Sequence, residues 1–198
     1  MSNDDPIYLQ ALQQFEVLYE RAKQTDTPDA TAVTLATADR AGRPSARTVL
    51  LKAHDKRGFV FYTNNQSRKG EQLKANPNAA LLFFWQALYE QALIEGPVEV
   101  VSDPESDAYW ASRSRESRIG AWASDQSRPV ESRAELEARV EAVDARFAGV
   151  DVPRPPHWHG FRVVPQRMEF WQGGDHRLHD RQCYRRIGAI WHRELLNP

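Results

Sequence analysis

Short strand-like segments, each closed by a turn sequence, recur along most of this chain. They are rich in β-branched and aromatic residues, and the turns between them carry Gly, Pro and Asp, as in residues 39–44 and 55–58. Short strands joined by such turns favour antiparallel sheets. We expect strands over residues 32–38, 46–53, 59–63, 79–85, 91–101, 161–164, 168–172, 177–186 and 191–196. Together with a few helices, these strands predict an α+β protein built on a small closed barrel.

Four helices are expected beside these strands. Asp5 suits the N-cap of the first and Pro6 its first turn, and apolar side chains recur at helical spacing at Leu9, Leu12, Phe15 and Leu18. The other helices are predicted over residues 67–75, from residue 102 to about residue 113, and from residue 132. Residues 114–129 are polar and are expected to be irregular. We expect one domain overall, with a helix and a short arm in residues 1–28 and the barrel in residues 29–198.

Charge and cysteine content exclude several classes of partner and site. The 26 Lys and Arg residues balance 27 Asp and Glu residues to a net charge of −1, whereas nucleic-acid-binding domains are usually basic. The most apolar run, residues 79–89, is too short to span a bilayer. The single cysteine, Cys183, excludes an internal disulfide and a cysteine-based zinc site, and it fits a reducing cytoplasm. We therefore expect a cytoplasmic protein with no nucleic-acid, membrane or metal partner.

Two basic sequences could bind anions. Arg47 and Lys52 are five residues apart on a predicted strand, so they should point to opposite faces unless a bulge intervenes, and they could then serve two different anions. The alternative is two solvated charges at the strand ends. Arg68 and Lys69 fall in the first turn of a predicted helix, where cations oppose the helix dipole and are favoured only if an anion such as phosphate binds there. An ordinary helix cap with two solvated cations is equally compatible with that sequence.

Two further sets of donors have a regular spacing. Tyr109, Arg113 and Ser117 would share one face of a continuing helix and could hold a phosphate, but Ser114 and Ser117 could instead break the helix and leave a solvated face. Arg177, His179 and Arg181 would share one face of a strand, where three potential cations require an anion or a polar ligand. The alternative for that strand is a purely structural role.

Taken in order, these motifs resemble those of the pyridoxine (pyridoxamine) 5′-phosphate oxidases. The likeness covers the chain from about residue 29 to its end. The matching motifs are Arg47-x4-Lys52, FVFYT at 59–63, SRK at 67–69, IGAWAS at 119–124 followed by Gln126 and Ser127, PxPxxW at 153–158, EFWQG at 169–173 and RLHDR at 177–181.

The resemblance implies an FMN-binding split β-barrel of antiparallel strands with flanking helices. It also implies a homodimer with the flavin in a cleft between subunits. The implied reaction oxidises C4′ of pyridoxine or pyridoxamine 5′-phosphate to pyridoxal 5′-phosphate by hydride transfer to the flavin. O2 accepts the electrons and yields H2O2, and the amine substrate also releases ammonia.

The resemblance also implies a role for individual residues. Flavin contacts are expected from Arg47, Thr48, Val49, Leu50, Leu51, Lys52, Tyr62, Thr63, Arg68, Lys69, Gln91, Gln126, Ser127, Trp171 and Arg181. Substrate contacts are expected from Lys52, Tyr109, Arg113, Ser117, Arg177 and His179. Of these, Arg177 and His179 are expected at the reacting edge of the substrate, and Asp29 matches an acidic residue that the family holds near it.

Two other functions compete with this one. The first is a related flavin oxidase acting on another substrate, such as the oxidases of phenazine synthesis. The presence of all four residues expected to anchor a substrate phosphate argues against it; these are Lys52, Tyr109, Arg113 and Ser117. The second is a non-catalytic split-barrel module that binds flavin or pyridoxal phosphate, which Arg177 and His179 argue against. The chain also departs from the family at its N-terminus, where a longer arm able to fold over the site is common.

Overall fold

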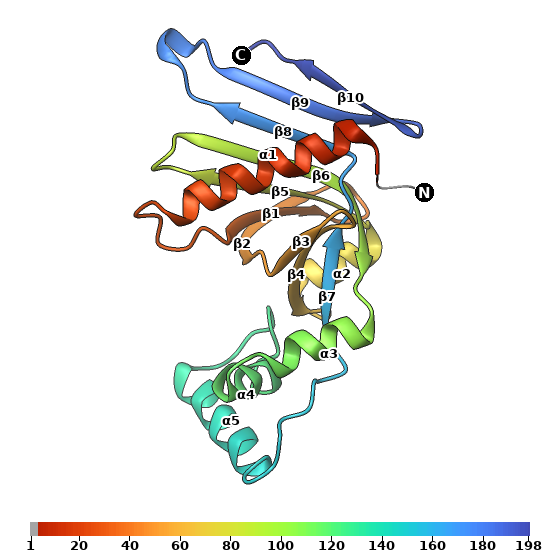
Figure 1. The fold of residues 1–198 in the computed structure, drawn as a ribbon. Coiled ribbons are helices and arrows are strands. Elements are labelled where there is room, and N and C mark those ends of the chain that lie inside the picture. Colours follow the sequence, from red (N-terminus) through yellow and green to blue (C-terminus); the bar gives the residue numbers. More distant parts are fainter. Residues whose placement is uncertain (1–3) are drawn as a thin grey trace.

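The computed structural model describes residues 4–198 and contains one antiparallel sheet with helices packed around it (Figure 1). The strands are β1 (Ala32–Ala38), β2 (Pro44–Leu50), β3 (Ala53–Asp55), β4 (Gly58–Asn64), β5 (Asn78–Trp85), β6 (Glu90–Val100), β7 (Trp158–Val163), β8 (Arg167–Gln172), β9 (Asp180–Ile187) and β10 (Ile190–Leu195). The helices are α1 (Pro6–Lys23), α2 (Arg68–Ala75), α3 (Asp103–Ala111), α4 (Arg115–Ala123), α5 (Arg133–Arg146) and the short 3₁₀ turn η1 (Asp175–Arg177). The predicted α+β class is confirmed. No helix in the described part of the chain is long and apolar enough to cross a membrane.

The long strand β6 curls this sheet. Its first half pairs with β8, from Glu90 to Glu95, whereas Val98 to Val100 pair with β7. Gly96 lies between the two halves, and a Cβ built on it would stand 2.0 Å from the carbonyl oxygen of Val164. Only glycine allows the two backbones to approach this closely. The sheet order β10-β9-β8-β6-β5-β1-β2 is therefore joined to β7, β4 and β3 through a single bent strand, which gives a half-barrel.

Helix α1 covers one face of the sheet (Figure 1). Phe15 is fully buried there, with its ring 4.7 Å from that of Phe59 and 5.3 Å from that of Phe83. The predicted N-cap Asp5 accepts hydrogen bonds from the backbone of Ile7 and, through its other oxygen, from that of Trp191 in β10. The cap thus also ties the helix to the last strand. The short arm predicted before α1 falls mostly on residues 1–3, outside the described residues.

The predicted buried face of α1 is partly wrong. Leu9 is 42% exposed, and the buried positions are Tyr8, Ala11, Phe15, Leu18, Tyr19 and Ala22. Phe15 and Leu18 are buried and Leu12 is partly buried, as the helical period requires, but in the first turns the buried positions are Tyr8 and Ala11 rather than Leu9. Tyr8 takes the expected place by stacking its ring 4.7 Å from that of Trp191.

A second apolar cluster holds the helical end of the molecule, opposite β8, β9 and β10 in Figure 1. It contains Trp110, Ile119, Phe147, Val152 and Trp158. The prediction that residues 114–129 are irregular is wrong for residues 115–123, which form helix α4 after the N-cap Ser114, and is confirmed for residues 124–129. The nine residues of α4 carry apolar side chains only in their second half, from Ile119 to Ala123, which is little more than one turn of apolar pattern.

Candidate active site

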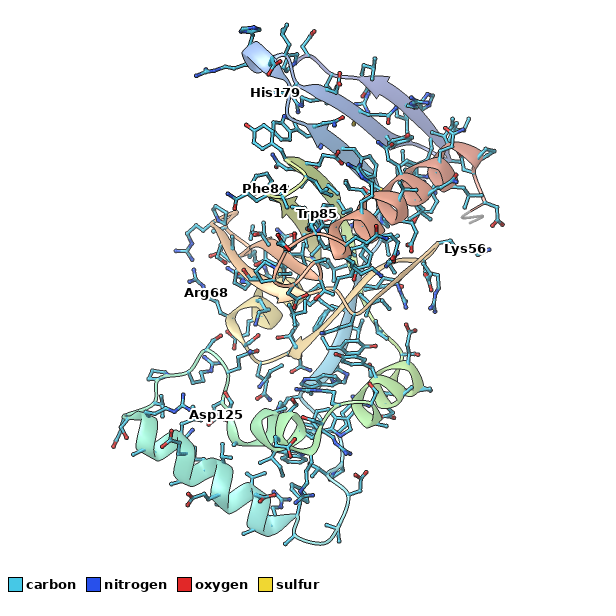
Figure 2. The ribbon with its side chains drawn as sticks, turned by 60° about the vertical axis from the view of Figure 1, so that its left-hand side comes forward. Lys56, Arg68, Phe84, Trp85, Asp125 and His179 are labelled. Atoms are coloured by element: carbon cyan, nitrogen blue, oxygen red, sulfur yellow. The ribbon has the colours of Figure 1, made fainter. Side chains whose placement is uncertain are left out.

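A cavity of about 930 Å³ opens between the barrel and the helical end. It is bordered by β2, β4, the N-terminus of α2 and the junction of α3 with α4. The lining residues are Ser45, Ala46, Arg47, Thr48, Val49, Leu50, Lys52, Tyr62, Thr63, Arg68, Lys69, Tyr109, Arg113, Ser114, Ser117, Gln126, Ser127 and Trp158. Five of these are Lys or Arg, and none of the described residues that line the cavity is acidic. Figure 2 shows Arg68 between the sheet and the segment that carries Asp125. Such a cavity favours ligands with more than one negative charge.

Arg47 and Lys52 both line this cavity, so the prediction that they point to opposite faces is wrong. Strand β2 ends at Leu50, and the alternation of side chains ends with it. The next two backbone N–H groups donate to other segments, from Leu51 to Thr31 and from Lys52 to Val60. Leu51 turns into the core, where it is buried, and it does not line the cavity.

Lys69 is a buried cation at one end of the cavity. Its Nζ donates to Thr63 Oγ1 at 3.1 Å, to Gln126 Oε1 at 3.2 Å and to Ser67 Oγ at 3.4 Å, all of which are neutral acceptors. Burial, with a smaller effect from the positive charge of Arg47, lowers the pKa of Lys69 to about 8. Ser67 caps α2 as the sequence predicted, so the cation lies beside free helical N–H groups. We call Arg47, Arg68 and Lys69 the first cationic group.

Tyr109, Arg113 and Ser117 also line the cavity, although no single helix carries them. Helix α3 ends at Ala111 and α4 begins at Arg115, so the alternative of a helix break was the correct one. Arg113 lies between the two helices and donates to the backbone oxygen of Ser117 at 3.0 Å. Together with Lys52, these three residues form the second cationic group.

Arg113 is held by aromatic rings rather than by carboxylates. Its guanidinium lies 4.9 Å from the ring centroid of Trp158 and 5.2 Å from that of Trp110. Its Nη1 is buried without a hydrogen-bond partner among the described residues, and burial lowers the pKa of the group. A buried, unpaired donor of this kind is costly unless a ligand supplies an acceptor. This orphaned atom therefore fits an anion bound at the second cationic group.

Stacked aromatic rings form one wall of the cavity. The ring of Tyr62 lies 4.1 Å from that of Tyr109 and 5.0 Å from that of Trp158, in near-parallel planes. Trp158, Ser45, Ala46 and Ser114 line the cavity and were missing from the sequence-based list. The PxPxxW motif contained Trp158, but nothing in that motif indicated that its ring would contact the guanidinium of Arg113.

Gln91, Trp171 and Arg181 lie elsewhere in the same chain. They line a separate hollow of about 200 Å³ with Leu82, Leu93, Glu169 and Pro198. They form one row across the sheet, because Phe84 pairs with Gln91, Gln91 with Trp171, and Trp171 with Arg181. Arg181 donates from Nε to the buried carboxylate of Glu169 at 2.8 Å. The candidate residues therefore form two groups within one subunit.

Arg177 and His179 do not lie on a strand, so the prediction that they share a strand face with Arg181 is wrong. Strand β9 begins at Asp180, and His176 and Arg177 adopt positive φ angles of 55° and 65° in the turn η1. Gly174 allows this turn, since a Cβ on it would stand 2.1 Å from the oxygen of Leu178. Figure 2 places His179 at the end of the molecule remote from Asp125. His179 belongs with the second hollow, because its ring lies 4.8 Å from that of Trp171.

Asp29 lies outside the cavity and the hollow. Its carboxylate accepts from the backbone N–H of Thr31 at 2.9 Å and from the Thr31 hydroxyl at 2.6 Å. These bonds close the turn before β1. A role for Asp29 near the substrate stays a prediction.

Two family models match the chain. The model for "Pyridoxamine 5′-phosphate oxidase" matches residues 20–147, and the model for "Pyridoxine 5′-phosphate oxidase C-terminal dimerisation region" matches residues 158–198. A pyridoxine/pyridoxamine 5′-phosphate oxidase of Myxococcus xanthus is 56% identical over 187 residues, which cover 94% of this chain and 91% of the relative. The enzyme of the same name in Sphingopyxis alaskensis is 53% identical over 196 residues, covering 99% of this chain and 88% of the relative.

Two solved structures share the fold. PhzG from Burkholderia lata, in complex with tetrahydrophenazine-1-carboxylic acid, superposes with a TM-score of 0.86 at 33% identity, over 96% of this chain and 92% of PhzG. An FMN-binding, pyridoxamine 5′-phosphate oxidase-related protein of Nostoc punctiforme superposes with a TM-score of 0.75 at 18% identity, over 94% and 97% of the two chains. These superpositions confirm the predicted split barrel. With the matched family models and relatives, they show that the chain belongs to the pyridoxine/pyridoxamine 5′-phosphate oxidase family.

Proposed function

We propose that this protein is an FMN-dependent oxidase that converts pyridoxamine or pyridoxine 5′-phosphate to pyridoxal 5′-phosphate. O2 accepts the electrons and H2O2 is released. One observation carries the proposal: a single cavity has two cationic groups and no acidic lining residue among those described. Two phosphorylated molecules, a cofactor and a substrate, would each occupy one group.

The first cationic group fits the phosphate of FMN. Arg47, Arg68 and Lys69 would hold one terminal phosphate at the N-terminus of α2, where helical N–H groups add to the positive potential. Thr63, Gln126 and Ser127 supply further polar atoms beside it. Bound FMN would supply the two-electron chemistry by which a hydride leaves the substrate carbon. The chain's own part is to bind and orient both molecules.

The second cationic group fits the phosphate of the substrate. Lys52, Tyr109, Arg113 and Ser117 would surround it with donors, and the buried Nη1 of Arg113 would gain its missing acceptor. Trp110 and Trp158 keep Arg113 in place, so its charge would be oriented before the substrate arrives. Fixing the phosphate in this way fixes the substrate ring, which is an orientation effect on the rate.

We infer that a complete site needs two copies of the chain. The row Phe84, Gln91, Trp171 and Arg181 lies on the face of the sheet opposite to buried Phe83 and Phe170, and Phe84 is 50% exposed. An exposed aromatic side chain beside candidate flavin residues fits a subunit interface. The C-terminal part of the chain also matches a family model described as a dimerisation region. In the homodimer, Gln91, Trp171 and Arg181 of one copy would face the cavity of the other.

Arg177 and His179 would reach the substrate from that second copy. Arg177 carries a permanent charge that can orient the hydroxyl or amine at C4′. His179 Nδ1 accepts a hydrogen bond from the backbone N–H of Gly174 at 3.1 Å, which leaves Nε2–H to donate a hydrogen bond to the substrate.

One assay separates the candidate functions. The purified protein, loaded with FMN, should release H2O2 on addition of pyridoxamine 5′-phosphate and much less on addition of unphosphorylated pyridoxamine. PhzG, which was solved with a carboxylic acid ligand, makes a phenazine-type substrate the second candidate. Release of H2O2 with tetrahydrophenazine-1-carboxylic acid alone would favour that candidate. Flavin binding without H2O2 from either substrate would indicate a non-catalytic module.

Lys69 should make FMN binding depend on pH. Its pKa of about 8 means that the empty site loses this charge at mildly alkaline pH, whereas a bound phosphate favours the protonated lysine. The affinity for FMN should therefore fall by up to about tenfold for each pH unit above that pKa. Quenching of flavin fluorescence measures it, with Lys69→Met as the control variant. A parallel pH profile in Lys69→Met would show that another group is responsible.

A further inference from the structure

Gln72 is a buried glutamine on α2 that does not line the cavity. Its side chain is 7% exposed, and its Oε1 accepts three hydrogen bonds. The hydroxyls of Thr37 and Ser45 each donate at 2.7 Å, and Arg47 donates from Nη2 at 3.2 Å. Three donors from the neighbouring strands β1 and β2 thus converge on one amide oxygen.

Every acceptor of Arg47 among the described residues is neutral. Its Nη1 donates to Thr37 Oγ1 at 2.6 Å and to the backbone oxygen of Leu35 at 3.2 Å, and its Nη2 donates to Ser45 Oγ at 2.7 Å. Each hydroxyl accepts a hydrogen bond from Arg47 and donates one to Gln72 Oε1. The amide oxygen of Gln72 is therefore the final acceptor of the whole network. Consecutive hydrogen bonds of this kind polarise and strengthen one another.

Two arginines with well-buried side chains, Arg162 and Arg154, are held by carboxylates instead. Arg162 donates to Glu99 and Glu105, and Arg154 donates to Asp103 and Asp107. A glutamate at position 72 would have the same shape as glutamine and would bind Arg47 at least as strongly. It would also compensate the charge of Arg47 and weaken its attraction for a ligand.

We propose that Gln72 is a positioning residue that fixes Arg47 through a neutral acceptor and so keeps the charge of Arg47 available to the phosphate of the cofactor. This inference rests on the proposed function, because it takes FMN as the ligand of the first cationic group. Gln72 acts only through Arg47, and the two hydroxyls complete the contact.

The variant Gln72→Glu tests whether the acceptor of Arg47 at position 72 must be neutral. The variant should bind FMN about tenfold to a hundredfold more weakly, as expected for compensation of one close charge. Riboflavin lacks the phosphate, so its affinity should not change. Both ligands are titrated into the apoprotein by fluorescence quenching. Gln10→Glu, at an exposed position of α1, changes the net charge equally and should leave both affinities unchanged.

A double-mutant cycle tests whether Gln72 acts through Arg47. Gln72→Met should weaken FMN binding about twofold to tenfold by freeing Arg47, and this effect should vanish when Arg47 is already methionine. The cycle decides the question even if Gln72→Glu does not fold. Equal FMN affinity in Gln72→Glu and the original chain, or an undiminished Gln72→Met effect without Arg47, would overturn the inference. Failure of the original chain to bind FMN would instead reject the proposed function.

Discussion

Two impaired variants, Arg113→Leu and Arg177→Met, should restore activity when they are combined in one dimer. Arg113 lines the cavity, whereas Arg177 lies in the turn η1, two residues before His179, and is not among the residues that line the cavity. If each site takes its cavity from one copy and its C-terminal residues from the other, a mixed dimer contains one intact site and one doubly altered site. Random pairing of equal amounts should recover about a quarter of the original activity. Co-expression of two differently tagged chains, followed by the peroxide assay at low substrate concentration, measures it.

A matched pair serves as the control for this experiment. Arg113→Leu and Lys52→Met both alter the cavity, so every mixed dimer has two defective sites and no recovery is expected. Recovery in both pairs would point to an effect on folding or expression. Absence of recovery in both pairs would show that each chain builds its own site.

Arg113→Leu alone should weaken substrate binding while leaving FMN in place. The change removes a charge-assisted contact to the substrate phosphate, worth about 1.5–3 kcal/mol, so KM should rise about tenfold to a hundredfold. The first cationic group is untouched, and the flavin content should stay the same. Arg113→Lys keeps the charge but loses the planar group that lies over Trp158, so it should recover only part of the affinity.

Arg177→Met provides the contrast to this variant. It should depress turnover as well as affinity, because Arg177 is assigned to the reacting edge of the substrate rather than to its phosphate. Flavin loss with unchanged substrate affinity in Arg113→Leu would contradict the division into two cationic groups. Normal turnover and a lower melting temperature in Arg177→Met would indicate a purely structural role.

Local signals in the sequence predicted much of this fold. Ser67, Ser102 and Ser132 cap helices where the sequence places them, because an N-cap depends on a side chain and the backbone within one turn. Helix α4 was missed because it is only nine residues long and its apolar side chains are confined to its second half. The strand predicted from residue 177 began three residues later, because Gly174 and two residues with positive φ form a turn that side-chain spacing does not reveal.

Sequence patterns established which residues carry charge and donors, the antiparallel pairing of short strands, and the resemblance to a flavin oxidase family. The tertiary structure alone decided which of these residues meet. Arg47 and Lys52 share a cavity because β2 ends between them, and Tyr109 and Arg113 share it although their helix breaks. The packing also determined that the guanidinium of Arg113 lies over the ring of Trp158 and that Arg47 donates to the neutral Gln72 rather than to a carboxylate. The reason is physical: strand and helix periods follow from local backbone geometry, whereas convergence of distant side chains depends on where elements end and how they pack.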